Sequence, residues 1–175
     1  MKNVMPDIVV EYVMEEVVKS ASKIYGKPLY FYPDHFLAIH KELMTRNKSK
    51  EGASQKYPAI MLLCDFVEII KSETTLNADL QFLIVADSIP NASLNLRRKK
   101  VYDPVLRPVY HSFFIAIHKS SKVRVDNHRD VVKINRSRMN DAFSEAAKRT
   151  NMPPILNEYV DGIEIKVNLI FRNVC

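Results

Sequence analysis

Three carboxylates that follow apolar segments are the residues best placed for acid–base chemistry. Asp65 and Glu68 come after the apolar run 58–64, and Asp87 ends a second apolar segment. Carboxylates at adjacent strand ends serve as general acid and base when they converge on one substrate. More often such residues cap strands and keep loops in water, and no other catalytic pattern accompanies them. The sequence therefore predicts a protein that is not an enzyme.

Histidines, cysteines and glycines form no recognisable metal or phosphate motif. His111 and His118 are seven residues apart and fit one face of a helix, but no cysteine or carboxylate in sequence completes a metal set. Cys64 lies inside an apolar segment, where a thiol behaves as a small hydrophobic group. The chain has three glycines and lacks the glycine-rich phosphate-binding motifs. We therefore expect no cofactor and no bound metal.

Basic side chains are concentrated in the second half of the chain. Residues 1–90 contain 10 basic and 12 acidic side chains, whereas residues 91–175 contain 16 basic and 8 acidic ones. The densest basic run is Arg97, Arg98, Lys99 and Lys100. This asymmetry fits a surface that faces nucleic acid or an acidic protein partner, and it equally fits a solvated basic face. No aromatic residues alternate with the charges, as a stacking platform for single strands requires.

The size of the chain predicts one domain to position these residues. A length of 175 residues with 47% hydrophobic and 26% charged residues is typical of a single globular domain. The longest apolar run, 58–64, is far shorter than the roughly 20 residues of a membrane-spanning helix. We therefore expect no contact with a membrane.

Two helices are predicted in the first third of the chain. Residues 8–24 carry apolar side chains at three- and four-residue spacing, with Asp7 as the expected N-cap and Gly26 as the expected left-handed C-terminal residue. A shorter helix is expected after Asp34. Its predicted apolar face consists of Phe36, Leu37, His40, Leu43 and Met44.

The longest helical candidate is the stretch 97–119, which contains two prolines. Asp103 followed by Pro104 fits an N-cap with proline at the first helical position, where its missing N–H costs no hydrogen bond. Pro108 is expected to bend the helix that follows. Residues 138–150 also have helical composition.

Strand patterns occur at residues 29–32, 59–64, 80–87 and 163–169. The run 59–64 is continuously apolar, as a strand covered on both faces is, whereas 163–169 alternates like a half-exposed strand. Residues 46–56 form the expected exposed loop, and residues 71–77 a hairpin connection or protruding tip. The predicted fold is α+β, with a mostly antiparallel sheet of about four to five strands packed with three or more helices.

Four segments follow one another in a recognisable order. They are 57–66, 78–86, the proline-containing helix start 101–110, and 156–165. This order resembles small neck or tail proteins of tailed bacteriophages, of the kind found in crAss-like phages of gut bacteria. It is also similar to the tail-terminator and tail-completion fold, in which an α+β protomer builds a ring. The resemblance covers roughly residues 8–118 and 155–171, and residues 120–152 depart from it as a basic, helix-prone insertion.

The resemblance implies a structural role in the virion. The chain would be a subunit of a six- or twelve-fold ring that connects the portal side of the head to the tail, with DNA passing through the lumen. Neighbouring portal, neck or tail proteins are the implied partners, with non-specific contact to DNA. The protein would be made in the cytoplasm of the host bacterium.

The resemblance suggests which residues would contact DNA, adjacent rings or neighbouring subunits. Arg97, Arg98, Lys99 and Lys100 are the residues expected to line the lumen or to face an adjacent ring. The 46–56 loop, the 71–77 tip and the 120–152 insertion are candidate arms that reach neighbouring subunits. The alternative interpretation of the basic half is a nucleic-acid-binding module.

Overall fold

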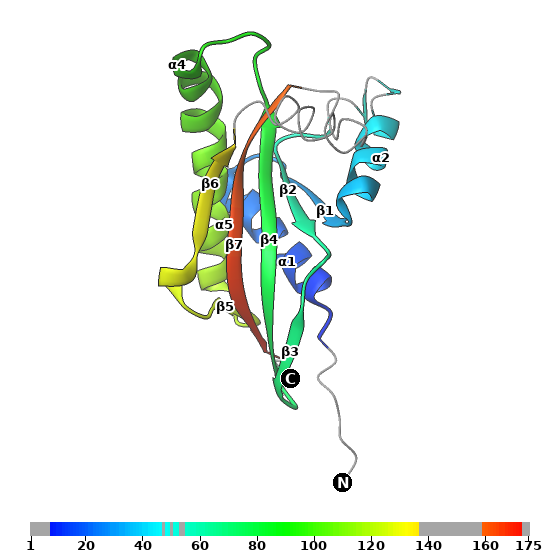
Figure 1. Ribbon diagram of the computed structural model, residues 1–175, viewed down its shortest axis with the longest axis vertical. Helices are drawn as coiled ribbons and strands as arrows, with labels where there is room; N and C mark the ends of the chain where they lie inside the picture. The colour runs from blue at the N-terminus through cyan, green and yellow to red at the C-terminus, as the bar shows by residue number, and fades with distance from the viewer. Residues whose placement is uncertain (1–7, 47, 50, 53–54, 137–158, 173–175) are drawn as a thin grey trace, which may run out of the picture.

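The computed structural model of the protein describes residues 8–46, 48–49, 51–52, 55–136 and 159–172 (Figure 1). The helices are α1 (Val10–Tyr25), α2 (Phe36–Arg46), α4 (Leu94–Arg97), the π-helical η1 (Arg98–Leu106), α5 (Arg107–Lys119) and the short 3-10 helix η2 (His128–Asp130). The strands are β1 (Tyr30–Asp34), β2 (Ala59–Leu63), β3 (Glu68–Ser72), β4 (Thr75–Asp87), β5 (Val123–Val125), β6 (Val132–Arg136) and β7 (Val160–Arg172). The predicted α+β class is confirmed.

The strands form one seven-stranded sheet in the order β1-β2-β4-β7-β5, with β3 also paired to β4 and β6 also paired to β7. The β1–β2 pair is parallel and the other five pairs are antiparallel, which confirms the mostly antiparallel sheet. The predicted number of strands, about four to five, is too low. Strands β3, β5 and β6 are only three to five residues long, so period-two alternation barely develops in them.

Helices α1 and α5 pack on one face of the sheet and enclose the larger core. The rings of Phe82 on β4 and Phe113 on α5 meet edge to face, with centroids 5.0 Å apart, and both side chains are fully buried. Helix α2, at the upper right of Figure 1 beside β1, packs on the other face through a smaller core that includes Ile39, Leu43 and Val85. In the part of the chain that the structure describes, no helix covers the lower part of that face, which we call the open face.

Helix α1 ends as the sequence predicts but begins differently. Gly26 adopts a left-handed conformation with φ of 79°, and its N–H donates to the carbonyl oxygen of Ser22. The N-cap is Val9, which makes no side-chain capping hydrogen bond, so the predicted start of the helix is wrong by a few residues. Asp7, the expected cap, lies outside the described residues.

The predicted start of the long helix at Asp103 and Pro104 is wrong. The helix begins at Leu94, where the side chain of Ser93 accepts a hydrogen bond from the N–H of Leu96 at 3.3 Å, and it continues through η1 into α5. Pro104 lies inside the π-helical segment η1. A proline in the interior of a helix removes one backbone donor, and wide π-type turns are a common place to absorb such a break.

Helix α2 forms at the expected place but presents a different face to the core. Ile39 and Leu43 are buried, whereas Leu37 is 62% exposed and Met44 is 37% exposed. Of the five residues predicted to form the apolar face of this helix, Leu43 alone is buried. The reason is that the smaller core receives only a narrow stripe of this helix, which leaves room for one buried residue per turn.

Part of the predicted basic insertion belongs to the sheet. Within residues 120–136, where short β-prone pieces alternate with charges, strands β5 and β6 each pair with β7, and the 3-10 turn η2 lies between them. Residues 137–152, with the helix expected at 138–150, lie outside the described residues. The 46–56 loop is described only in part, and residues 71–77 form a hairpin that contains the end of β3, a turn at 73–74 and the start of β4.

Candidate functional site

The four residues of the predicted basic contact surface do not share one environment. Arg97 is buried, and its Nη1 lies 2.8 Å from Oδ1 of Asp161 at the start of β7. Ser88 donates its hydroxyl hydrogen to the other carboxylate oxygen of Asp161, at 2.6 Å. An arginine held in this way inside the subunit cannot reach a lumen or a neighbouring ring. The expectation for Arg97 is therefore wrong.

Arg98, Lys99 and Lys100 are exposed on η1, as the sequence suggested. Arg98 lies near Asp103, with 3.8 Å between Nε and Oδ2, and Arg107 makes a closer contact of 2.7 Å to the same carboxylate. Exposed ion pairs of this kind stabilise a fold by less than about 1 kcal/mol, so they leave these cations available to solvent and to partners. We call Arg98, Lys99 and Lys100 the η1 basic surface.

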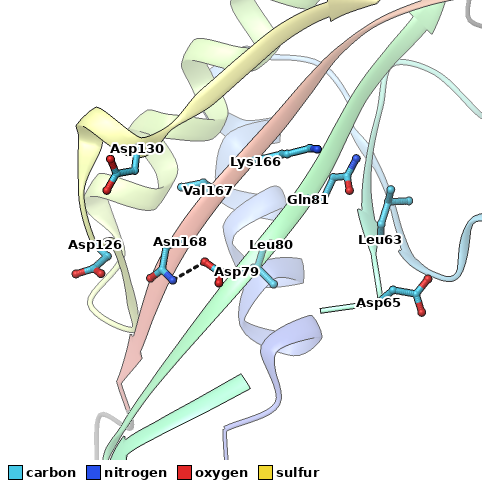
Figure 2. A pocket seen from close by; sticks show the side chains of 10 residues that line it. All are labelled: Leu63, Asp65, Asp79, Leu80, Gln81, Asp126, Asp130, Lys166, Val167 and Asn168. Carbon is cyan, nitrogen blue, oxygen red and sulfur yellow. Dashed lines mark hydrogen bonds between the residues drawn. The ribbon is translucent and has the colours of Figure 1, made fainter. Parts of the chain in front are cut away.

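A polar groove of about 550 Å³ lies on the open face (Figure 2). Among the residues that the structure describes, four carboxylates line the groove, and Lys166 is its one basic lining residue. The carboxylates are Asp65, Asp79, Asp126 and Asp130. Asn168 donates from its Nδ2 to Oδ1 of Asp79 at 2.6 Å, so two neighbouring strands are linked across the floor. The groove has an acidic character, opposite in sign to the η1 basic surface.

The carboxylates named from the sequence do not converge. Asp65 lies at the rim of the groove, where its carboxylate contacts Nδ1 of His35 at 2.9 Å. Glu68 is exposed on β3. Asp87 ends β4 six residues beyond Gln81, the groove residue nearest to it on that strand, which corresponds to about 20 Å of extended chain. The three side chains therefore do not meet at one acid–base centre.

The histidine and cysteine side chains of the described residues do not gather at one site either. The rings of His118 and His128 stack with centroids 5.0 Å apart, and His111 packs against Tyr110. Among the described residues, no group of three or more His, Cys, Asp or Glu side chains is arranged to hold a metal ion. Burial raises the pKa of the Cys64 thiol to about 11, so the thiol is protonated near neutral pH.

The exposed apolar residues of β3 were not predicted from the sequence. All five residues of this strand are exposed, including Ile69 at 44% and Ile70 at 49%, and Val67 just before it is 66% exposed. Adjacent isoleucines in a short strand between charged residues could have signalled an unusual surface, because exposed apolar side chains rarely cluster without a partner. This strand is the second candidate surface.

Comparison with known proteins identifies no relative that indicates a function. No protein-family model matches the chain, and no curated protein has a matching sequence. Over the described residues, none of the helices combines the length and the apolar character that crossing a membrane requires.

Proposed function

We propose that this protein is a structural subunit of an oligomeric ring in the neck or tail of a tailed phage, connecting the portal and head to the tail around the DNA channel. The observation that supports this proposal is a sheet whose two edges differ and to which no further strand is paired within the described residues. Its centre is the uninterrupted pairing of thirteen residues of β4 with thirteen of β7. Different edges on the two sides of one subunit permit head-to-tail contacts, and such contacts close into rings when the rotation between subunits allows it.

The charged surfaces fit a subunit placed between other virion components. The η1 basic surface provides three exposed cations for the lumen or for an acidic surface of an adjacent ring. Dispersed positive charge around a channel attracts DNA without the base contacts that would hold it in one place. The acidic groove on the open face supplies a surface of opposite sign for a basic neighbour.

The partners that follow from this proposal are further copies of the chain, in a six- or twelve-fold ring, and the portal, neck or tail proteins above and below it. Contact with DNA is non-specific. The protein is synthesised in the host cytoplasm and resides in the virion. In this role it needs no catalytic residues and no cofactor.

Native mass spectrometry of the purified chain, combined with electron microscopy of the same sample, tests the proposal. We expect closed rings, either from the chain alone or after portal or tail proteins are added. A chain that stays monomeric at the highest soluble concentration and binds none of these virion proteins would contradict the ring function.

A nucleic-acid-binding module is the second candidate, supported by the η1 basic surface. It predicts binding to duplex DNA whose affinity falls steeply with salt, because each neutralised phosphate releases counterions. Replacing Arg98, Lys99 and Lys100 together by alanine should then reduce the slope of the salt dependence. The matched control removes three exposed lysines elsewhere, at positions 19, 23 and 27. A weak affinity that changes equally in both triple variants would exclude a dedicated binding surface.

A further inference from the structure

The upper part of the sheet ends on each side in a strand with an unpaired edge. Strand β1 pairs with β2 alone and β6 with β7 alone in the described part of the chain, so the outer side of each strand has no partner there. The outer side of an edge strand carries backbone N–H and C=O groups that can pair with another chain. Strands β1 and β6 are therefore the two places at which a further strand can widen this part of the sheet.

The two edge strands occupy the same five rows of the sheet. We follow the register from β1 through β2, β4 and β7 to β6. Tyr30 then lies in the row of Arg136, and Asp34 lies in the row of Val132. The three rows between these two match as well, so β1 and β6 begin and end at the same levels. This part of the sheet is a block of five strands with two edges of equal length.

The strand directions allow a second copy to continue this block. Strand β1 runs antiparallel to β4, whereas β6 runs parallel to it. A second copy that is related by rotation about an axis along the strands keeps these directions. Its β6 therefore meets β1 of the first copy as an antiparallel neighbour, the arrangement with the more direct hydrogen bonds.

The backbone of β1 presents two residues to such a neighbour. The N–H of Tyr30 donates to the carbonyl of Pro58 at 3.1 Å, so the peptide groups of Tyr30 face β2. Because successive residues of a strand direct their peptide groups to alternate sides, those of Phe31 and Pro33 face outward. Phe31 offers an N–H and a C=O, whereas Pro33 offers a C=O alone.

The backbone of β6 presents its free groups in the same rows. The N–H of Asp126 donates to the carbonyl of Asn168 at 3.1 Å, which shows that alternate residues of β7, counted from Asn168, face β5 and β6. Lys133 and Asn135 are opposite the other set of β7 residues, so their peptide groups face outward.

These outward groups match in an antiparallel pair. Phe31 shares its row with Asn135, and two hydrogen bonds can join them. Pro33 shares its row with Lys133, and its C=O can accept from the N–H of Lys133. A shift by one residue sets outward-facing groups against inward-facing ones, so a specific register is required.

Charge favours a second copy of this chain as the occupant. Strand β1 carries Asp34 as its charged residue, and β6 carries Lys133 and Arg136. The helix layer repeats this contrast, because α1 contacts β1 whereas α5 contacts β5 and η1 contacts β7. Helix α1 carries three carboxylates and two lysines, whereas η1 and α5 together carry five basic residues and one carboxylate. Opposite charge on two surfaces that meet favours the contact and its orientation.

We propose that copies of this chain join through their upper sheet edges, with β1 of one copy pairing antiparallel with β6 of the next. This inference rests on the proposed ring function and specifies its subunit interface. Strand β3 lies one strand further in than β1, so it stays two inter-strand spacings, about 10 Å, from β5 of the next copy. The exposed Ile69 and Ile70 of β3 then line a slot between two copies.

Disulfide cross-linking tests this geometry. The variant carries Asp34→Cys and Val132→Cys, with Cys64→Ala and Cys175→Ser to remove the native thiols. Asp34 and Val132 are exposed, and in the proposed pair they are a non-hydrogen-bonded pair with about 4.5 Å between their Cα atoms, within the range of a disulfide. Within one chain they are four inter-strand spacings apart, about 19 Å, so any bond between them joins two copies.

The matched control replaces Asp34→Cys by Ile69→Cys. Ile69 is also exposed, at 44%, and lies on the neighbouring strand edge. In the proposed assembly it is two strand spacings and four rows from Val132 of the next copy, about 17 Å, which is too far for a disulfide. We expect mild oxidation to give covalent oligomers of the Asp34→Cys, Val132→Cys variant on a non-reducing gel, with the bond identified by mass spectrometry, while the control stays mostly monomeric.

Charge reversal tests the same contact without cysteines. Val132→Asp sets a carboxylate opposite Asp34 of the next copy, and like charges directly opposite each other in a sheet repel. We expect it to weaken self-association at least tenfold and the further change Asp34→Lys to restore it, whereas Ile69→Asp should have little effect. All three positions are exposed, so circular dichroism should show the wild-type fold for each variant.

The outcomes separate the interface from the function. Rings that form without the bond between positions 34 and 132 and that tolerate Val132→Asp overturn the edge pairing and leave the ring function standing. Cross-linked chains that remain open support the edge pairing and contradict the ring. A chain that forms no such bond, either alone or with portal and tail proteins, refutes the edge pairing, and the assembly assay then decides the ring function separately.

Discussion

Removing Arg97 should destabilise the protein strongly, because it takes away the cation that lies 2.8 Å from the buried Asp161 carboxylate. The side chains are 6% and 0% exposed, and the ion pair joins the long helix to β7 across 64 residues of sequence. Breaking a buried pair by removing one partner costs about 3–5 kcal/mol. That is a large part of the roughly 5–15 kcal/mol that stabilises a typical domain. We therefore expect Arg97→Ala to lower the melting temperature by roughly 6–20 °C.

Urea unfolding followed by far-ultraviolet circular dichroism measures this loss as a change in the free energy of unfolding. Lys19→Ala is the matched control, because Lys19 pairs with Glu15 at 2.7 Å while both side chains are well exposed. This control should cost less than about 1 kcal/mol. If Arg97→Ala costs no more than the control, the buried pair does not stabilise the fold in the way argued.

A paired replacement distinguishes the lost charge partner from lost packing. Changing Arg97→Met and Asp161→Leu together removes both charges, and buried ion pairs replaced by apolar residues of similar size are often neutral or stabilising. Ser88, which loses its acceptor, is half-buried and can bond to water. The double variant should therefore recover most of the stability lost in Arg97→Ala. A loss equal to the sum of the two single changes would refute the reasoning.

Two further predictions concern a thiol and a helix terminus. With Cys175→Ser in place, the raised pKa of Cys64, about 11, keeps the reactive thiolate scarce, so alkylation by iodoacetamide should be slow near neutral pH and should accelerate only as the pH rises toward that value. The unfolded chain is the control, and equal rates for folded and unfolded protein would contradict the prediction. Gly26→Ala should cost about 1–2 kcal/mol in urea unfolding, because φ is 79° and no atom lies within 4 Å of the added Cβ, so that the backbone conformation alone sets the cost. Gly26→Asn should cost less, and equal losses for both variants would argue against the left-handed terminus.

Much of the fold is predictable from local patterns in the sequence. The apolar run 59–64 and the alternating tail 163–169 correspond to strands β2 and β7, and the periodicity of residues 8–24 corresponds to α1. These patterns are readable because each element has a continuous apolar stripe or surface that must be buried. The short edge strands β3 and β6 lack such a surface, and their partners lie far away in sequence.

The candidate surfaces were less predictable than the fold. The basic run at residues 97–100 is visible in the sequence, but its first residue turns inward because that position of the helix faces β7. Asp161 appears in the sequence as an ordinary charged residue between Val160 and Gly162. Only the pairing of distant elements shows that it requires a cation.

The sequence by itself determined the class of the fold, the apolar strands and helices that build its core, and the left-handed residue that ends α1. These are consequences of side-chain size, polarity and backbone freedom within a few neighbouring residues. The tertiary structure alone decided which charges are buried, which carboxylates stay apart and which strand edges remain open. Those properties depend on contacts between segments that lie dozens of residues apart, and local periodicity specifies which face of an element is apolar without specifying what will cover it.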